Sequence, residues 1–228
     1  MKTLERGDIE SINFGGHDGT VTEVCGYQNF NITDTDIKAL NNPTSKRSWV
    51  DTKIKSDFFV DVFDNLNPKT YADFGSNLGY YVFWAAHRGV PSTGIDYNLE
   101  YISVCNTIKT RHNIKKANFV NTNLQNSTIS VAPVDFMTVF NVIHHLYNRT
   151  EQYRDMERLV GDFARLANDI LFEVPTENDP KGHKWTMNTG YTEELFVKNA
   201  NNIFENVTRI PGQTEHRPYY LCRGSKFV

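Results

Sequence analysis

The sequence predicts an α/β protein whose sheet is mostly parallel. From Thr70 onward, strand-like apolar segments alternate with segments of helical periodicity, which is typical of parallel strands joined by crossover helices. Glycines follow the first strand-like segment closely, at Gly75 and Gly79. The last two strand-like segments have no helix between them, which predicts a closing antiparallel hairpin.

Composition limits the class of protein. The chain has 228 residues, of which 39% are apolar and 22% charged, as in an ordinary globular protein. A net charge of −3 provides no global attraction to nucleic acid. The three cysteines are far apart and form no CxxC pair, so we expect neither a metal site nor a disulfide framework. Because neither a secretory signal nor an apolar membrane span is recognisable, we expect a cytoplasmic protein without a membrane partner.

The elements begin after a different N-terminal region. Glycines punctuate residues 1–45, which predicts a loop-rich extension that serves as a lid or an interaction element. Residues 46–228 form the predicted main domain. Apolar residues recur at helical spacing from Val50 to Leu66, and this pattern predicts a helix. Asn67-Pro68 ends it, because a proline disfavours helical geometry in the residue before it.

Strand and helix signals then alternate along the rest of the chain. The predicted strands are 70–75, 92–97, 118–123, 133–142, 169–175, 204–210 and 219–224. The predicted helices are 78–88, 98–112, 150–166 and 192–200. The second of these carries its apolar residues on one side, at Leu99, Ile102, Cys105 and Ile108. Seven strands in this order predict a sheet with helices on both faces.

The first strand-to-helix turn is where we look for a ligand, because parallel sheets bind ligands at the carboxyl ends of their strands. The turn reads Asp73-x-Gly75-x-x-x-Gly79. A dinucleotide fingerprint requires G-x-G-x-x-G, and Asn77 stands at the central position. No Gly-Lys-Ser/Thr sequence follows, so a P-loop is absent. A tight turn without a ligand is the alternative.

The turn resembles motif I of the class I S-adenosylmethionine-dependent methyltransferases, with Asn77 in place of the central glycine. Asparagine tolerates left-handed backbone angles better than most residues do. The resemblance implies a Rossmann-like fold and S-adenosyl-L-methionine as cofactor. It assigns cofactor contacts to Asp73, Gly75, Ser76, Asn77 and Gly79.

Two further segments extend the resemblance. Asp96 in "GIDYN" follows Asp73 by 23 residues (96 − 73), and a carboxylate at a strand end is the expected partner of ribose hydroxyls. The resemblance assigns Asp96 and its neighbour Tyr97 to the nucleoside, although Asp96 also suits a helix N-cap. The segment "VDFMTVFNVIHHL" is similar to motif IV and places Asn141 at a strand end. The resemblance also implies adenine contacts from Asn123 and Leu124, at the end of the third strand.

Catalytic and acceptor-binding candidates follow the same strand ends. His144 or His145 is placed to take a hydroxyl proton near pH 7, and the alternative is that both only pack or orient the backbone. Glu173 and Arg217 are candidate contacts to the methyl acceptor, with a surface role equally open for Arg217. Trp49 is a candidate lid residue or a packing residue. No HxxxH or HExxH spacing suggests a metal.

The sequence therefore predicts a methyltransferase that acts on an oxygen of a small molecule or of a saccharide end. The segments "DFGSNLGYYVFWAAHRG", "NVIHHL" and "HRPYYLCRG" are loosely similar to the methyltransferase part of O-antigen-capping enzymes. A tRNA or other RNA methyltransferase is the alternative enzyme, and the basic segment "IKTRHNIKK" keeps a nucleic-acid partner open without favouring it. A non-catalytic cofactor-binding protein is the third hypothesis. The oligomeric state is not predicted.

Overall fold

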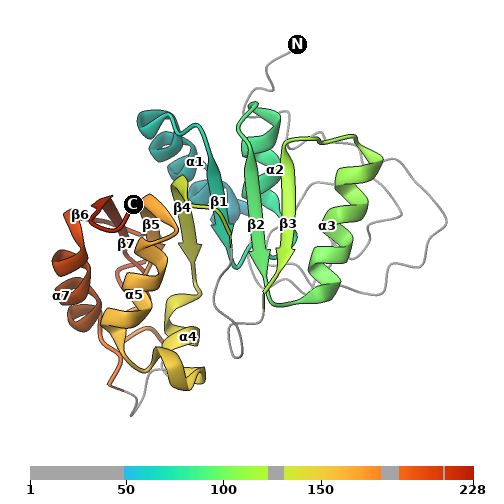
Figure 1. Ribbon diagram of the computed structural model, residues 1–228. Coiled ribbons are helices and arrows are strands. Elements are labelled where there is room, and N and C mark those ends of the chain that lie inside the picture. Colours follow the sequence, from blue (N-terminus) through green and yellow to red (C-terminus); the bar gives the residue numbers. More distant parts are fainter. Residues whose placement is uncertain (1–48, 123–130, 181–189, 213) are drawn as a thin grey trace. The chain divides into compact units, whose positions relative to one another are not determined.

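The structure is a computed structural model that describes residues 49–122, 131–180, 190–212 and 214–228. The chain divides into two compact units, Met1–Asn121 and Thr122–Val228, and each is described by itself (Figure 1). The predicted boundary between residues 45 and 46 lies outside the described residues, as do Asn123 and Leu124.

The described part of the first unit, from residue 49 to residue 121, contains three parallel strands with helices between them. Its elements are α1 (Trp49–Leu66), β1 (Tyr71–Phe74), α2 (Tyr80–His87), β2 (Ser92–Asp96), α3 (Leu99–Arg111) and β3 (Ala117–Asn121). β2 lies between β1 and β3, and both pairs are parallel; Figure 1 shows the three strands side by side and α3 next to β3. The carboxyl ends of these strands therefore share one edge.

Aromatic packing holds α1 in place. The Phe59 ring lies 5.6 Å from that of Tyr71 and 5.2 Å from that of Trp84, and Phe63 lies 5.1 Å from Trp84, measured between centroids. Both phenylalanines are buried. The helix ends at Leu66, and the following Asn67 adopts a φ of 47° and donates its N–H to the carbonyl of Phe63 at 2.9 Å.

Helix α3 follows its predicted apolar side except at its first residue. Ile102, Cys105 and Ile108 are buried, whereas Leu99 is 67% exposed. The Asn98 side chain accepts the Glu100 N–H at 2.9 Å and caps the helix. Leu99 is thus the first residue after the cap, where its side chain stays open to solvent.

In the residues of the second unit that the structure describes, there are four strands of mixed direction. Its elements are β4 (Val134–Phe140), α4 (Ile143–Arg149), the 3₁₀ turn η2 (Glu151–Tyr153), α5 (Met156–Ala164), β5 (Ala167–Glu173), α7 (Glu193–Ile203), β6 (Phe204–Ile210) and β7 (Tyr219–Ser225). β4 and β5 are parallel, while β7 is antiparallel to both β5 and β6. The antiparallel hairpin is as predicted, with β7 inserted between β5 and β6.

The single helix predicted over residues 150–166 was wrong. Thr150 is extended, with φ −120° and ψ 133°, and its hydroxyl donates to the Leu146 carbonyl at 2.7 Å, which closes α4. The Asp155 side chain accepts the N–H groups of Glu157 and Arg158 at 2.9 and 3.3 Å and starts α5 as a new helix. Two local caps override the continuous apolar spacing.

The strand β5 forms the centre of this unit's core. Its residues from Ile170 to Glu173 are at most 1% exposed, as expected for a strand covered on both faces. The Phe172 ring contacts Phe163 of α5 at 5.8 Å and Phe196 of α7 at 5.2 Å between centroids. This packing fixes the carboxyl end of β5, where Glu173 lies.

Candidate functional site

The turn between β1 and α2 has the backbone that its sequence predicts. Gly75, Asn77 and Gly79 have φ values of 78°, 50° and 78°, so every second residue is left-handed. Glycine and asparagine are the residue types that adopt these angles at least cost. The N–H groups of Gly75 and Ser76 both donate to the carbonyl of Ile95, at 2.8 and 3.1 Å, which ties the turn to the end of β2.

The carboxylate of Asp96 connects the turn to the next loop. Its Oδ2 accepts the N–H of Asn77 at 2.8 Å, and its Oδ1 accepts the N–H of Asn98 at 2.9 Å. Burial raises the pKa of Asp96, and the hydrogen bonds from the backbone of Asn98 and Asn77 oppose that rise. The structure thus places Asp96 beside the turn, although Asp96 and Asn77 are 19 residues apart in the sequence.

Asn121 is a supporting residue that the sequence analysis missed. Its Nδ2 donates to the backbone carbonyls of Asp96 at 3.1 Å and Tyr97 at 2.9 Å. This clamp from the end of β3 holds the loop in which the Tyr97 side chain is 75% exposed. The sequence predicts the strand end at Asn123, whereas β3 ends two residues earlier, at Asn121.

Two polar residues of the turn are buried beside it. Asp73 is 3% exposed and Ser76 is 1% exposed. Within the described part of the chain, the Ser76 hydroxyl has no hydrogen-bond partner. A buried hydroxyl without a partner costs about 1–3 kcal/mol.

In the second unit, Asn141 and the two histidines follow β4. Asn141 adopts a φ of 59°, directly before α4, on which His144 and His145 lie with ring centroids 4.0 Å apart. The Asn141 Oδ1 accepts a hydrogen bond from Nη1 of Arg217 at 2.5 Å. The Nη2 of Arg217 donates to Asp179 at 2.5 Å. The structure thus brings Asn141 and Arg217 into contact, although they are 76 residues apart in the sequence.

Burial changes what the histidines can do. Desolvation, followed by the charges of His145, Arg217 and Arg149, lowers the pKa of His144 to about 2. Desolvation, Arg149 and Arg217 lower that of His145 to about 4. Imidazoles with such pKa values are neutral at pH 7 and accept protons weakly. Of the two, His145 retains the higher pKa and the greater exposure, so it is the better candidate base.

The low pKa of His144 makes stability depend on pH. A folded pKa of about 2 against an ordinary 6.5 means that stability is complete above about pH 6.5 and is lost as the pH falls, because the unfolded chain binds the proton first. At about pH 5, this histidine should cost about 2 kcal/mol of unfolding free energy. When the pH is lowered from about 7.5 to about 5, the unfolding free energy of His144→Gln should fall by about 2 kcal/mol less than that of wild type. Urea unfolding at the two pH values measures this difference. Equal losses in both proteins would contradict the lowered pKa.

The structure gives less information about the other two candidate acceptor-binding residues, Glu173 and Trp49. Glu173 is 1% exposed and pairs in register with Tyr219 of β7, so its contact with an acceptor stays a prediction. Trp49 is the first residue of α1, and its side chain lies outside the described part. Among the described residues, no group of histidine, cysteine or acidic side chains is arranged to hold a metal ion. In the same ranges, no helix has the length and apolarity to cross a membrane.

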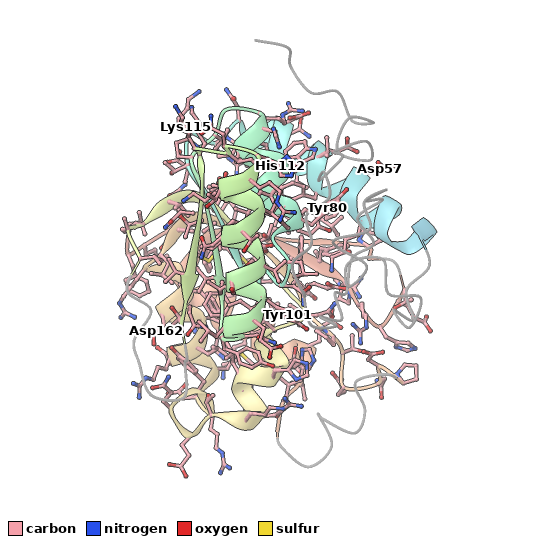
Figure 2. The ribbon with its side chains drawn as sticks, turned by 90° about the vertical axis from the view of Figure 1, so that its right-hand side faces the viewer. Asp57, Tyr80, Tyr101, His112, Lys115 and Asp162 are labelled. Atoms are coloured by element: carbon pink, nitrogen blue, oxygen red, sulfur yellow. The ribbon has the colours of Figure 1, made fainter. Side chains whose placement is uncertain are left out.

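The basic segment after α3 lies away from Asp96. Figure 2 shows Tyr101 near one end of α3 and His112 near the other, and a helix of 13 residues is about 20 Å long. Asp96 precedes the Tyr101 end. At the opposite end, the Lys116 ammonium donates to the carbonyl of Gly89. The cations of this segment therefore do not surround the candidate nucleoside carboxylate.

Part of the chain resembles a known protein family. Residues 72–166 match the family model described as a methyltransferase domain. This part of the chain is therefore similar to methyltransferase domains. The predicted resemblance to the class I S-adenosylmethionine-dependent methyltransferases is confirmed. A search of curated protein sequences found no significant match.

Solved structures share the fold at low sequence identity. One is the bifunctional kinase-methyltransferase WbdD, with 19% identity, a TM-score of 0.63 and coverage of 75% of this chain and 39% of that chain. Another is an O-methyltransferase family protein from Burkholderia thailandensis, with 13% identity, a TM-score of 0.55 and coverage of 82% and 62%. The N-terminal domain of EvdMO1 with S-adenosylhomocysteine (SAH) bound has 12% identity, a TM-score of 0.56 and coverage of 74% and 80%.

These likenesses establish the fold class. The Rossmann-like α/β fold, with seven strands that are mostly parallel and antiparallel strands toward the C-terminus, is as predicted. The chain spans about two fifths of the length of WbdD.

Proposed function

We propose that this protein transfers a methyl group from S-adenosylmethionine to an oxygen of a small molecule or of a saccharide end. The observation that carries the proposal is the hydrogen bond from Asn77 N–H to Asp96 at 2.8 Å. It joins a left-handed turn to a carboxylate at the next strand end, which is the arrangement that a nucleoside cofactor requires. The methyltransferase match over residues 72–166 supports it.

The residues of the first unit fit such a cofactor. The Asp96 carboxylate would accept hydrogen bonds from the two ribose hydroxyls, and the exposed Tyr97 ring would pack against adenine. The turn from Gly75 to Gly79 lets a ligand approach the backbone closely, and the Ser76 hydroxyl supplies a donor that the described residues leave unused. Asp73, buried at the end of β1, would face the amino-acid end.

The chemistry demands alignment more than activation. When bound, S-adenosylmethionine supplies a methyl group on a positively charged sulfur that leaves readily. The protein's task is to orient the acceptor oxygen, and good orientation is worth about 7–11 kcal/mol. For a hydroxyl acceptor, His145 would take the proton at Nδ1 or Nε2, at a rate limited by its low pKa. Glu173 would orient the acceptor through its carboxylate.

An activity screen tests the proposal. The protein is incubated with methyl-labelled S-adenosylmethionine and, separately, with free sugars, sugar phosphates and tRNA, and transfer of label is measured. We expect transfer to a saccharide or another small hydroxyl compound. Transfer to tRNA alone would establish the RNA alternative. SAH binding without transfer to any acceptor class would favour the non-catalytic alternative.

Tyr97 gives a separate prediction about the adenine contact. Stacking of a base on an aromatic ring is worth about 1–3 kcal/mol, so Tyr97→Ala should weaken SAH binding about 10-fold. Calorimetric titration measures this change, with Phe227→Ala as the control because it removes another exposed ring, from the second unit. Unchanged affinity in Tyr97→Ala would exclude the stacking role.

A further inference from the structure

Four cationic side chains gather in the first unit where α3 ends and β3 begins. Lys109 and Arg111 lie in the last turn of α3, and Lys115 and Lys116 precede β3. Figure 2 shows Lys115 at this end of the helix. The sequence from residue 101 to residue 122 contains no acidic residue. We call these four side chains the basic surface.

The fold itself uses little of this positive charge. The dipole of a helix places only about half a negative charge at its C-terminus, so four cations exceed what α3 needs. In the described ranges, Lys109 and Lys115 form no ion pair with a carboxylate. The ammonium of Lys116 donates to the uncharged carbonyl of Gly89. Since Arg111, Lys115 and Lys116 are also exposed, the basic surface favours an anionic partner.

A groove runs along α3 and reaches the basic surface. Its lining includes Ile102, Ser103, Thr107 and Arg111, and it begins at Leu99, whose side chain is 67% exposed. The Thr107 hydroxyl donates to the Ser103 carbonyl of its own helix at 3.0 Å, so this hydroxyl proton is already engaged. The groove therefore offers apolar contact at one end and positive charge at the other. A partner that combines apolar residues with acidic ones fits it.

The N-terminal residues of the same chain have this composition. Residues 1–36 contain seven acidic and two basic residues, a net charge of −5 (2 − 7), whereas the whole chain has a net charge of −3. The acidic surplus of the chain is thus concentrated in these residues. The stretch "TVTEVCGYQNFNITDTDI" also places apolar residues among its acids. Its charge is complementary to the basic surface.

The connection to α1 is long enough for this contact. Residues 37–48 are 12 residues that join the acidic residues to α1, and such a length spans up to about 40 Å. Helix α1 packs against β1, where Phe59 lies 5.6 Å from Tyr71 between ring centroids. Only β2 separates β1 from β3, which is a distance of about 10 Å. The basic surface is therefore within reach.

We propose that residues 1–36 dock onto the basic surface and the groove along α3 of the same chain. The proposal goes beyond the proposed function, because the contact requires neither the cofactor nor the methyl acceptor. Carboxylates of residues 1–36 pair with the cations of the basic surface, and their apolar neighbours contact the Leu99 end of the groove. A second copy of the chain and an RNA are the competing occupants, and the experiments below separate them.

Carbodiimide cross-linking of the full chain tests the proposal, because this reagent joins a carboxylate to an ammonium group only where the two are in contact. Mass spectrometry of the digested protein identifies the joined residues. At 0.1 M NaCl, we expect cross-links from acidic residues within 1–36 to Lys109, Lys115 and Lys116. Their yield should fall at 1 M NaCl, where the screening length drops from about 10 Å to about 3 Å.

Lys198 is the internal reference for this measurement, because it is exposed on α7 of the second unit. Residues 1–36 should join to it much less often than to Lys115. Equal yields at Lys198 and Lys115, or the absence of cross-links to the basic surface, would overturn the proposal.

Two variants of equal net charge test the role of the cations. Lys109→Gln with Arg111→Gln should lower the yield of cross-links to Lys115 about 5-fold, because two exposed ion pairs are lost. Lys198→Gln with Arg154→Gln removes the same charge from exposed positions of the second unit and should leave that yield unchanged. Equal yields in the two variants would contradict the proposed contact.

A variant of the N-terminal residues keeps the test decisive if the first variant does not fold. Asp34→Asn with Asp36→Asn changes no residue of α3, and it should also lower the yield of cross-links between Lys115 and the remaining acids of residues 1–36. An unchanged yield in this variant would count against docking through these carboxylates.

The competing occupants give different results. In an equal mixture of ¹⁴N- and ¹⁵N-labelled protein, the cross-linked peptides should each carry a single isotope. Pairs of mixed isotope would assign the contact to a second copy and overturn docking within one chain. For RNA, filter retention of tRNA is measured at 0.1 M NaCl. Retention that is lost in Lys109→Gln with Arg111→Gln, without cross-links from residues 1–36 to Lys115, would assign the surface to RNA and overturn the proposal.

Discussion

Replacing Gly79 with alanine should lower the free energy of unfolding by about 3 kcal/mol, combining left-handed strain with overpacking. Gly79 has a φ of +78°, and a Cβ built there would lie 2.6 Å from Cε1 and 2.8 Å from Cζ of Phe119. Phe119 is itself buried in β3 and lies 5.0 Å from the Phe83 ring of α2. The ring therefore cannot move away without disturbing the contact between α2 and the strands.

Gly89 provides a control for the strain alone. Its φ is +85°, but the nearest atom to a built Cβ is the flexible Lys116 Nζ at 3.9 Å. Gly89→Ala should therefore cost only about 1 kcal/mol. Urea unfolding of both variants measures the difference. Equal losses would show that Phe119 exerts no steric restriction on Gly79.

Replacing Asp96 with alanine should weaken SAH binding about 100-fold. Two ribose hydroxyls lose a charged acceptor, and a hydrogen bond to a charged group is worth about 1.5–3 kcal/mol. The variant also removes the acceptor of the Asn77 and Asn98 N–H groups, so the turn itself becomes less ordered. Calorimetric titration of the variant with SAH measures the loss.

Two variants separate these effects. Asp64→Ala removes a carboxylate of the same unit that pairs with Arg88 at 2.6 Å on the surface, and it should keep the wild-type affinity. Asp96→Asn retains one oxygen acceptor and should fall between wild type and Asp96→Ala. Wild-type affinity in Asp96→Ala would remove the carboxylate from the cofactor site.

The affinity for SAH should also fall on acidification. Burial raises the pKa of Asp96, and only the ionised carboxylate accepts hydrogen bonds at both oxygens. Binding is therefore complete above the raised pKa and is lost as the pH falls through it, at a higher pH than for an ordinary aspartate. Titrations over a pH series in wild type and Asp96→Asn test this expectation. The Asp96→Asn variant should lack this pH dependence.

The sequence predicted the turn because its backbone requirement is local. Left-handed angles at Gly75, Asn77 and Gly79 select the residue types that can adopt them. The position of Asp96 beside the turn follows from another rule, that parallel strands bring their carboxyl ends to one edge, and its contact with a cofactor stays a prediction. Each strand or helix signal was equally local, and the alternation of these signals along the chain predicted the fold class.

The contacts that escaped prediction depend on long-range pairing or on competing caps. Arg217 meets Asn141 across 76 positions and Asp179 across 38, and nothing in their neighbouring residues indicates the pairing. The break at Thr150 was hidden because the apolar spacing continues through it, while the caps at Thr150 and Asp155 decide the helix ends.

The most direct test of the account is calorimetric titration of the wild-type protein with SAH and, separately, with NAD⁺. A cofactor bound at the Gly75–Gly79 turn and Asp96 predicts saturable binding of SAH and no binding of NAD⁺, since Asn77 replaces the glycine that a dinucleotide pyrophosphate requires. Binding of NAD⁺ without binding of SAH would contradict the account.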